Sequence, residues 1–379
     1  MYITLLVYFM LFCMMISFNL ISSYQTSHLC KNEVNKKFNI PFLTIFVFAI
    51  VFGIRYNVGI DHIRYIERYE ELRLFGTDSS DPELGFLMIG KFFASLDLHY
   101  SFYFFFLAFL QLFLIFYALR YNYKVLGWVI VTFMLSTTFL NFMNGIRQQL
   151  AFCIQTVALL YLSRKKIVKC YLYLCLAILF HTSAILLLPL PLFYLRKNNY
   201  FNNVSIQIKL FFVFLIGSAV FKPVVPIFLS IMDILEVFGY QGYKYMVLGG
   251  DLSFLTPKRT AGLGFILLII LNLINITQSN KVKAYHNSLY LNLLYDFYFV
   301  GVLYNYLVSG SLIFERINFY FYNFSFIISA FTLYYFTKNR TKKNQYLKIM
   351  MILIYLLLFY AIVVFRGEES CAIYNTCFQ

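Results

Sequence analysis

The chain has 379 residues, of which 61% are apolar and only 12% are charged. A soluble globular domain is closer to half apolar and a quarter charged, so this composition excludes a soluble enzyme. It predicts an all-α polytopic membrane protein with about 10–12 transmembrane helices. In a soluble protein, the net charge of +15 would suggest nucleic-acid binding. In a membrane protein Lys and Arg mark cytoplasmic loops, so we expect no nucleic-acid partner.

Apolar segments long enough to cross a bilayer recur along the chain. We expect spans near residues 2–22, 40–54, 100–119, 125–143, 146–162, 208–222, 260–278, 286–309, 313–336 and 346–365. The first is interpreted as a retained span, because it lacks a basic n-region and a clear cleavage site. We expect a single transmembrane domain over 1–379, with outer loops at 55–84 and 222–259 that are too short to build a core of their own.

Two segments are ambiguous. Residues 84–97 (LGFLMIGKFFASLD) are short and contain Lys91, which favours an interfacial or re-entrant helix. Residues 170–195 could be one long span or a tight hairpin with His181 at its tip.

The distribution of charge favours the hairpin. If the Lys- and Arg-rich loops face the cytoplasm, Glu33 is the one acidic residue among them, whereas the opposite loops carry both signs. That bias follows the positive-inside rule. It keeps 84–97 on the outer side, makes 170–195 enter and return, and places both termini outside.

Arg147, Gln148 and Gln149 interrupt an apolar segment directly after Asn144-Gly145. Asn-Gly is expected to end one helix and begin another. A helix N-terminus favours anions, and a guanidinium beside it adds a bidentate grip on phosphate. The amides of Gln148 and Gln149 can hydrogen-bond sugar hydroxyls. The alternative is an arginine that extends to the membrane interface.

Other ionisable groups are expected near the same membrane level. They are Arg55, Asp61 and Arg64 in the first outer loop, Glu83 at its end, His181 at the hairpin tip, and Glu315 and Arg316 at the start of a later span. Such groups are costly unless paired or solvated, so we expect them to face a water-accessible cavity. The rest of the charged stretch 64–73, including Arg68, is expected to form a solvated amphipathic face.

Several of these residues have a structural alternative. His181 could be a buried structural histidine rather than a phosphate ligand or a proton-transfer group. Glu315 and Arg316 could form a local pair. Asp296, deep in an expected span, is interpreted as a partner for core polar groups rather than as a proton relay.

The sequence contains no DxD-type metal motif, Walker loop, GxGxxG or HExxH. We therefore expect neither a metal nor a cofactor. Of the seven cysteines, Cys371 and Cys377 could pair if the tail lies outside the cytoplasm.

Four segments resemble, in this order, the EpsG family of polysaccharide polymerases, which is similar to the Wzy-type O-antigen polymerases. They are RYNVGIDHIRYIERYE, PELGFLMIGKFFAS, FMNGIRQQLAFCIQTVALLYLSRKK and LAILFHTSAILLLPLPLF. The resemblance covers roughly residues 40–200.

The resemblance implies a GT-C-like fold in the bacterial cytoplasmic (inner) membrane, with the active site at the periplasmic face. It implies transfer of a growing glycan from undecaprenyl pyrophosphate onto a lipid-linked repeat unit, without metal or nucleotide. The implied partners are undecaprenyl-pyrophosphate-linked oligosaccharides, membrane lipid, and the chain-length regulator and flippase of the same pathway.

This chemistry suggests a role for each candidate residue. Arg147 and Arg316, with Arg55 or Arg64, would stabilise the pyrophosphate leaving group. Asp61 is the first candidate for the base and His181 the second. Substrate contacts would come from Tyr56, Asn57, Glu83, Asn144, Gln148, Gln149 and Glu315.

Two other functions are possible. A flippase for the lipid-linked oligosaccharide would need cations through mid-membrane and broken helices. A sugar-modifying membrane acyltransferase would need a His paired with an acid near the cytoplasmic side.

Overall fold

The computed structural model describes residues 2–29, 40–76, 83–196, 200–220, 262–308, 312–366 and 374–377. These residues are almost entirely helical, which confirms the all-α class. The α-helices are α1 (Tyr2–Leu29), α2 (Phe42–Gly53), α3 (His62–Phe75), α4 (Leu84–Ser95), α5 (Tyr100–Ala118), α6 (Leu126–Leu135), α7 (Thr138–Asn144), α8 (Ile146–Ser163), α9 (Ile167–Phe180), α10 (Leu190–Arg196), α11 (Val204–Val220), α14 (Leu263–His286), α15 (Leu289–Val308), α16 (Leu312–Tyr322), α17 (Phe324–Lys338) and α18 (Lys342–Phe359).

Short helices and one strand pair complete the described part of the chain. The 3-10 helices are η1 (Arg120–Val125) and η2 (Thr182–Leu187), and the π-helix η3 spans Tyr360–Arg366. Strands β1 (Arg55–Tyr56) and β2 (Asn375–Thr376) pair antiparallel.

Four described helices are long and apolar enough to cross a membrane, within Ile3–Tyr24, Tyr100–Ala118, Leu263–His286 and Lys342–Val363. A bent pair, Arg120–Leu135 with Thr138–Asn144, raises the number to five. The chain is therefore a multi-pass membrane protein. Several other expected spans coincide with shorter apolar helices, so the total of about 10–12 stays a prediction.

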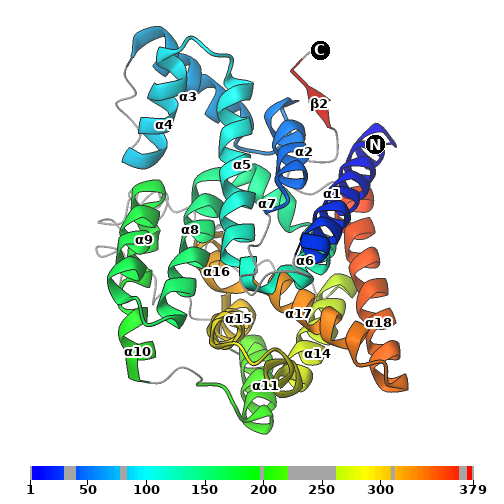
Figure 1. The fold of residues 1–379 in the computed structure, drawn as a ribbon. Helices are drawn as coiled ribbons and strands as arrows, with labels where there is room; N and C mark the ends of the chain where they lie inside the picture. The colour runs from blue at the N-terminus through cyan, green and yellow to red at the C-terminus, as the bar shows by residue number, and fades with distance from the viewer. Residues whose placement is uncertain are drawn as a thin grey trace.

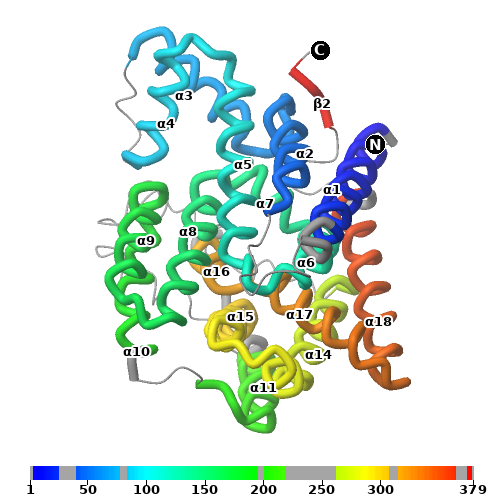
Figure 2. Tube along the Cα trace, viewed as in Figure 1, coloured from blue at the N-terminus to red at the C-terminus, as the bar shows by residue number. Residues whose placement is uncertain are grey.

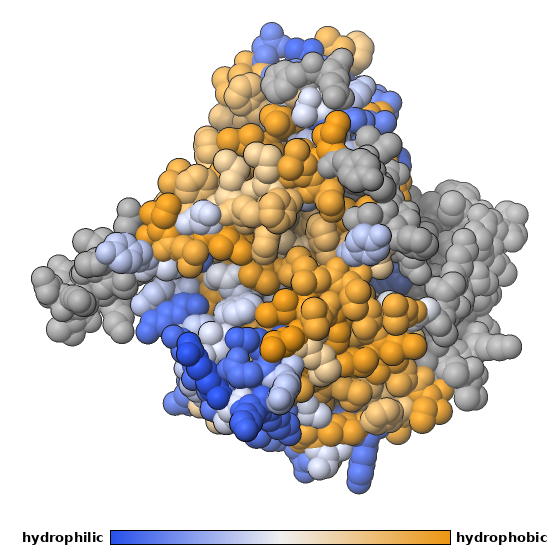
Figure 3. Space-filling view, turned by 90° about the vertical axis from the view of Figure 1, so that its right-hand side faces the viewer, coloured by the Kyte–Doolittle hydropathy of each residue, from blue (hydrophilic) through white to orange (hydrophobic). Residues whose placement is uncertain are grey.

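The surface supports the same conclusion. Large apolar side chains such as Phe9, Phe46, Phe102 and Leu353 are exposed. Figure 3 shows apolar side chains over most of the middle of one face, with hydrophilic side chains gathered toward its two ends. A bilayer covers such a surface, whereas water would not favour it.

Helix α8 lies at the centre of the fold, between α5 and α9 (Figure 1). It is buried along almost its whole length, and its polar residues contact other backbones and amides. Gln155 Nε2 donates to the Tyr320 carbonyl at 3.0 Å, and the Thr156 carbonyl accepts from Tyr290 Oη at 2.9 Å. These bonds satisfy polar groups that no water reaches, and they fix α15 and α16 against α8.

Two expected spans are interrupted helices. The segment 125–143 bends by 70° between α6 and α7, where Thr137 has a positive φ of 61°. The segment 313–336 breaks at Asn323, whose Nδ2 donates to Gln149 Oε1 at 2.8 Å. In both places the helix interruption coincides with polar side chains that can replace backbone hydrogen bonds.

The segment 170–195 reverses direction at its centre. Helix α9 ends at Phe180, His181 is extended (φ −157°, ψ 114°), and η2 and α10 return beside α9 (Figure 2). The structure thus contains the hairpin alternative, with His181 at its tip. Helix α4 contacts this tip, because a Cβ on Gly85 would lie 3.0 Å from the Leu179 carbonyl oxygen.

The C-terminal tail packs beside the N-terminus, and both termini lie at one end of the molecule (Figure 1). Tyr374 N donates to Thr4 Oγ1, and Cys377 N donates to the Ile54 carbonyl, both at 2.8 Å. Cys377 is a free thiol in the described chain, whereas Cys371 lies outside the described residues. The disulfide therefore stays a prediction.

Basic residues gather at the far ends of the central helices. Arg164, after α8, donates from Nη1 to Tyr121 Oη in η1 at 3.0 Å. His286, near Lys281 and Lys283 at the end of α14, packs on Tyr334 near the end of α17. We call this the basic end. The 18 residues of α8 separate it from Gly145 by about 27 Å, at 1.5 Å per residue.

A glycine in α15 allows the broken α16–α17 segment to approach closely. A Cβ at Gly301 would lie 2.5 Å from Tyr322 N and 2.7 Å from the Phe321 carbonyl carbon. We expect Gly301→Ala to lower the stability of the purified protein in detergent by about 1–3 kcal/mol, because backbone atoms must move. Thermal melting would measure the loss.

The matched control is Gly217→Ala in α11, where nothing lies within 4 Å of the added Cβ. That change should be neutral or stabilise by about 0.5–1 kcal/mol, because alanine is the better helix former. Equal melting temperatures for the two variants would contradict the close approach.

Candidate active site

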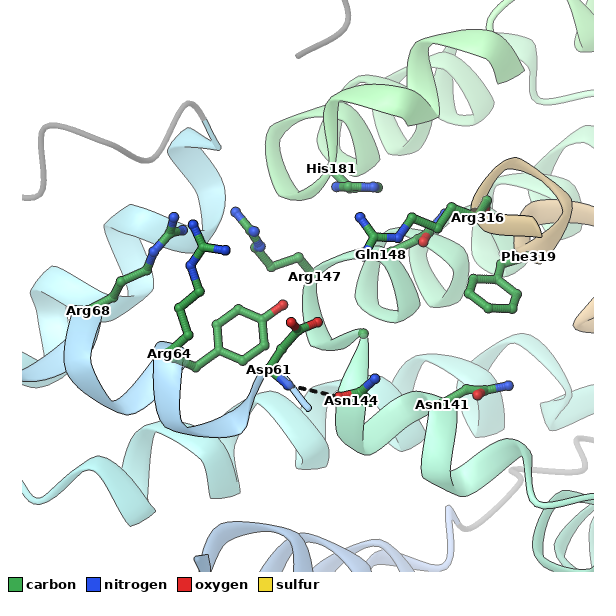
Figure 4. A pocket seen from close by; sticks show the side chains of 12 residues that line it. Asp61, Arg64, Arg68, Asn141, Asn144, Arg147, Gln148, His181, Arg316 and Phe319 are labelled. Atoms are coloured by element: carbon green, nitrogen blue, oxygen red, sulfur yellow. Dashed lines mark hydrogen bonds between the residues drawn. The ribbon is translucent and has the colours of Figure 1, made fainter. Parts of the chain in front are cut away.

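A cavity of about 200 Å³ lies where α3, the α7–α8 junction, the hairpin tip and α16 meet (Figure 4). Its lining is mostly polar, which is unusual in so apolar a chain. The lining residues are Asp61, Arg64, Tyr65, Arg68, Asn141, Asn144, Gly145, Arg147, Gln148, His181, Arg316 and Phe319. We call this space the arginine cavity.

One face of α3 forms one wall of the cavity. Asp61 precedes the helix, and Arg64, Tyr65 and Arg68 follow it at positions i+3, i+4 and i+7, which share one helical face. Asp61 N donates to Asn144 Oδ1 at 3.1 Å and so ties this wall to α7. Gly59, with φ +102°, lets the loop pass close to Asn144.

The α7–α8 junction forms the floor. Helix α7 ends at Asn144 and α8 begins at Ile146, where the Asn-Gly pair predicted a helix boundary. The start of α8 therefore faces the cavity, with Gly145, Arg147 and Gln148 in its lining. Backbone N–H groups in the first turn of a helix have no intrahelical acceptor, so they can bind an anion.

A buried carboxylate joins two of the lining residues. Glu83, only 4% exposed, forms an ion pair with Arg147, in which Oε2 lies 2.9 Å from Nη1, and its Oε1 contacts His181 Nδ1 at 2.5 Å. The Thr182 backbone also contacts this carboxylate. Glu83 thus lies behind the cavity wall, where its oxygens are occupied by protein groups. The structure places Glu83 where it positions Arg147 and His181, and its predicted sugar contact stays a prediction.

These contacts keep Glu83 ionised. Burial raises the pKa of the Glu83 carboxyl, but the hydrogen bond and charge of His181, then the Arg147 charge and the Thr182 backbone, outweigh it. The net effect holds the pKa below its ordinary value of 4.5. Because His181 Nδ1 is engaged by Glu83, Nε2 is the ring nitrogen that can contact a ligand in the cavity.

Helix α16 supplies Arg316 and, one turn later, Phe319. Gln148 Nε2 donates to the Arg316 carbonyl and thereby fixes α16 to the start of α8. Glu315, the neighbour of Arg316, does not line the cavity. Successive helical residues point about 100° apart, and on α16 it is Arg316 that points into the cavity.

Four other predicted substrate-binding residues are not in the lining. Arg55 is fully buried, donates from Nη2 to the Met143 carbonyl at 2.5 Å, and its guanidinium lies 4.0 Å from the centre of the Phe52 ring. Tyr56 lies in β1, which pairs with the tail strand, Asn57 follows it, and neither lines the cavity. Gln149 is fully buried against Asn323. Arg55 and Gln149 hold neighbouring elements together, and a substrate contact by any of the four stays a prediction.

The buried Arg55 also affects its neighbour His62. Burial, and then the Arg55 charge, lower the pKa of His62 to about 2, so its ring is neutral. The ring packs 5.1 Å from that of Phe104. His62 therefore does not line the cavity, although it follows Asp61 directly in the sequence.

The lining also includes residues that were not predicted: Tyr65, Arg68, Asn141, Gly145 and Phe319. A signal for several of them is present in the sequence. Positions 61, 64, 65 and 68, and positions 141, 144, 145 and 148, both follow the i, i+3, i+4, i+7 spacing of one helical face.

The electrostatic character of the cavity is cationic. Four arginines line it and one carboxylate, Asp61, opposes them. Within the described ranges, no group of three or more His, Cys, Asp or Glu side chains could hold a metal ion. The arrangement can bind a polyanion through guanidinium groups and a helix N-terminus.

A family model described as the EpsG family matches residues 38–376. The chain belongs to the EpsG family. The match covers nearly the whole chain and includes every residue that lines the arginine cavity. No curated protein and no solved structure matches the chain.

Family membership gives the coarse function. This EpsG-family chain is a glycan-polymerase-like membrane protein, and the family is associated with glycosyltransferase-like polymerases. The match also extends well past residue 200, where the sequence resemblance was not evident. Arg316 and Phe319 on α16 therefore fall within the family region.

Glu83 should make stability depend on pH. Because the pKa of the Glu83 carboxyl is lower in the folded protein, its ionised form stabilises the fold at pH values above the ordinary pKa of 4.5. This stabilisation is lost as the pH falls through the pKa of Glu83 in the folded protein. At pH 7 we expect Glu83→Gln to cost about 1–3 kcal/mol, because charged hydrogen bonds are lost. The difference in melting temperature between Glu83→Gln and the wild type should become smaller below pH 4.5.

Asp97→Asn is the control, because the Asp97 side chain is 85% exposed and its pair with Arg73 is a surface pair. It should change the melting temperature little at any pH. If the difference in melting temperature between Glu83→Gln and the wild type stays constant from neutral to acidic pH, the carboxylate charge does not stabilise the site.

Proposed function

We propose that the chain is a polysaccharide polymerase of the O-antigen type. It transfers a growing glycan from undecaprenyl pyrophosphate onto a lipid-linked repeat unit. The observation that carries this proposal is the arginine cavity, in which Arg64, Arg68, Arg147 and Arg316 converge beside the start of α8.

The leaving group determines what the cavity must do. When the bond from the anomeric carbon to the pyrophosphate oxygen breaks, negative charge grows on that oxygen. Fixed guanidinium groups stabilise this charge without the reorganisation that water would require. Arg147 is held in place by Glu83, and its guanidinium lies 5.6 Å from the centre of the Tyr65 ring.

The acceptor hydroxyl needs a base. His181 is the better candidate, because Glu83 orients the ring through Nδ1 and leaves Nε2 for the substrate. The hydroxyl oxygen attacks the anomeric carbon, its proton moves to Nε2, and the electron pair of the broken bond leaves with the pyrophosphate. Glu83 stabilises the imidazolium that forms. Asp61, which was ranked first from sequence, lines the cavity as the second candidate.

The proposed location follows from the two ends of the molecule. The arginine cavity and the basic end lie at opposite ends of α8. By the positive-inside rule the basic end faces the cytoplasm. The cavity then opens at the periplasmic face of the bacterial inner membrane, where it would meet undecaprenyl-linked oligosaccharides, membrane lipid, and the flippase and chain-length regulator of the pathway.

Two observations bear on the alternatives. The breaks at α6–α7 and α16–α17 are a feature of transporters, which keeps a flippase as the second candidate. The cavity arginines, however, gather at one end of the central helix. The His181–Glu83 pair would suit an acyltransferase, but it lies at the end opposite the basic loops.

Removing Arg147 tests the polymerase. We expect Arg147→Ala to lower polymerisation about 10²–10³-fold, as for loss of a group that stabilises transition-state charge. Arg147→Lys should restore it only in part, because lysine lacks the bidentate fork. Glycan length ladders from cells would show single repeat units in place of long chains for Arg147→Ala, and ladders of intermediate length for Arg147→Lys.

Arg73→Ala is the matched control, since Arg73 lies on α3 outside the cavity and pairs with Glu70 and Asp97 at the surface. It should leave the ladder unchanged. Long ladders with Arg147→Ala would refute the assigned site. A complete loss of exported repeat units would indicate a flippase, and normal length with altered sugar modification would indicate an acyltransferase.

Cysteine labelling tests the proposed side. In a cysteine-free background, cysteines at positions 64 and 316 should react with a membrane-impermeant thiol reagent from the periplasmic side. Cysteines at 165 and 343, at the basic end, should react with this reagent only after the membrane has been permeabilised. Reaction of 64 and 316 from opposite sides would contradict the proposed site.

A further inference from the structure

Phe319 presents an apolar ring to a cavity whose other walls are mainly polar. Two nearby rings, Phe321 on α16 and Phe324 at the start of α17, pack against aromatic partners. Phe321 stacks on Phe297 with ring centres 5.6 Å apart, and Phe324 packs on Phe152 at 4.9 Å. Phe319 instead lines the cationic cavity, where its ring is available to a ligand with an apolar face.

The amides beside Phe319 have hydrogen-bonding capacity directed at the same space. Asn141 lines the cavity one turn before Asn144, whose Oδ1 already accepts from Asp61 N. Gln148 uses Nε2 to hold the Arg316 carbonyl, which leaves Oε1 as an acceptor. An aromatic face flanked by amides suits a pyranose, because a sugar ring has C–H groups on its face and hydroxyl groups at its edge.

The cavity has two distinct ends (Figure 4). Arg64, Arg68 and Arg147 lie toward one end, Phe319 and Asn141 lie toward the other, and Arg316 extends from the Phe319 side. His181 lines the cavity between them. A diphosphate with a sugar attached is charged at one end and amphipathic at the other, so it matches this division.

We propose that Phe319 and Asn141 form a sugar subsite that binds the sugar directly attached to the diphosphate. This inference rests on the proposed function and adds the orientation of the substrate to it. The diphosphate faces Arg64, Arg68 and Arg147, and the first sugar stacks on Phe319. Its anomeric carbon then lies between the two ends, within the part of the cavity that His181 lines.

Binding of two lipids to the purified full-length chain in nanodiscs separates this subsite from the diphosphate site. One probe is undecaprenyl pyrophosphate without sugar. The other is the lipid-linked oligosaccharide that accumulates in cells lacking this chain. We expect Phe319→Ala to weaken binding of the sugar-bearing lipid about fivefold to tenfold, by loss of the stacked face, and to leave binding of the sugar-free lipid unchanged.

Three variants sharpen the test. Phe319→Tyr keeps the aromatic face and should bind both lipids as the wild type does. Asn141→Ala should act like Phe319→Ala. Phe321→Ala, on the same helix but stacked on Phe297, controls for general damage to α16 and should not discriminate between the two lipids.

Each outcome decides the question. Equal weakening of both lipids by Phe319→Ala, or no weakening of either, would overturn the sugar subsite while leaving the diphosphate site in place. The same selective loss with Phe321→Ala would also overturn it. Failure of the wild type to bind either lipid would refute the proposed function itself.

Discussion

The buried Glu83 carboxylate is the contact on which the site depends. It connects the start of α4, the start of α8 and the tip of the hairpin, which are far apart in sequence. A carboxylate at 4% exposure is costly unless its charge is matched, and here an arginine, a histidine and a backbone group match it. The requirement to satisfy one acid therefore fixes the positions of two groups that face the substrate.

Amide side chains perform the corresponding task for the broken helices. Asn323 and Gln149 meet where α16 ends, and Gln148 and Gln155 donate to carbonyls of α16. These bonds supply the internal partners that a chain in hydrocarbon must provide for an interrupted helix. The interruptions let the start of α8 and one face of α16 meet at the same cavity. The glutamines that first marked this segment as unusual thus serve mainly to assemble its walls.

The sequence predicted the membrane class, the helix boundary at Asn144-Gly145, and the hairpin with His181 at its tip. It also predicted Asp61, Arg64, Asn144, Arg147, Gln148, His181 and Arg316, all of which line the cavity. These residues stand out because charge and amides are rare in an apolar chain. Among the predicted residues that do not line the cavity are Arg55, which is buried beside Phe52 and Phe104, and Glu83, whose partners come from distant segments. Such tertiary contacts leave no local pattern. Arg68 was missed although its spacing from Asp61 marks a shared helical face.

The charges of the assembled site agree with the proposed reaction. Four arginines and two carboxylates, Asp61 and the paired Glu83, leave two positive charges when His181 is neutral. A diphosphate esterified at both ends carries two negative charges, so the bound donor is balanced. As the bond to the sugar breaks, a third negative charge develops on the leaving oxygen. The proton taken from the acceptor simultaneously makes His181 cationic, next to the Glu83 carboxylate. The positive charge of the site therefore rises in the same step in which the leaving group needs it.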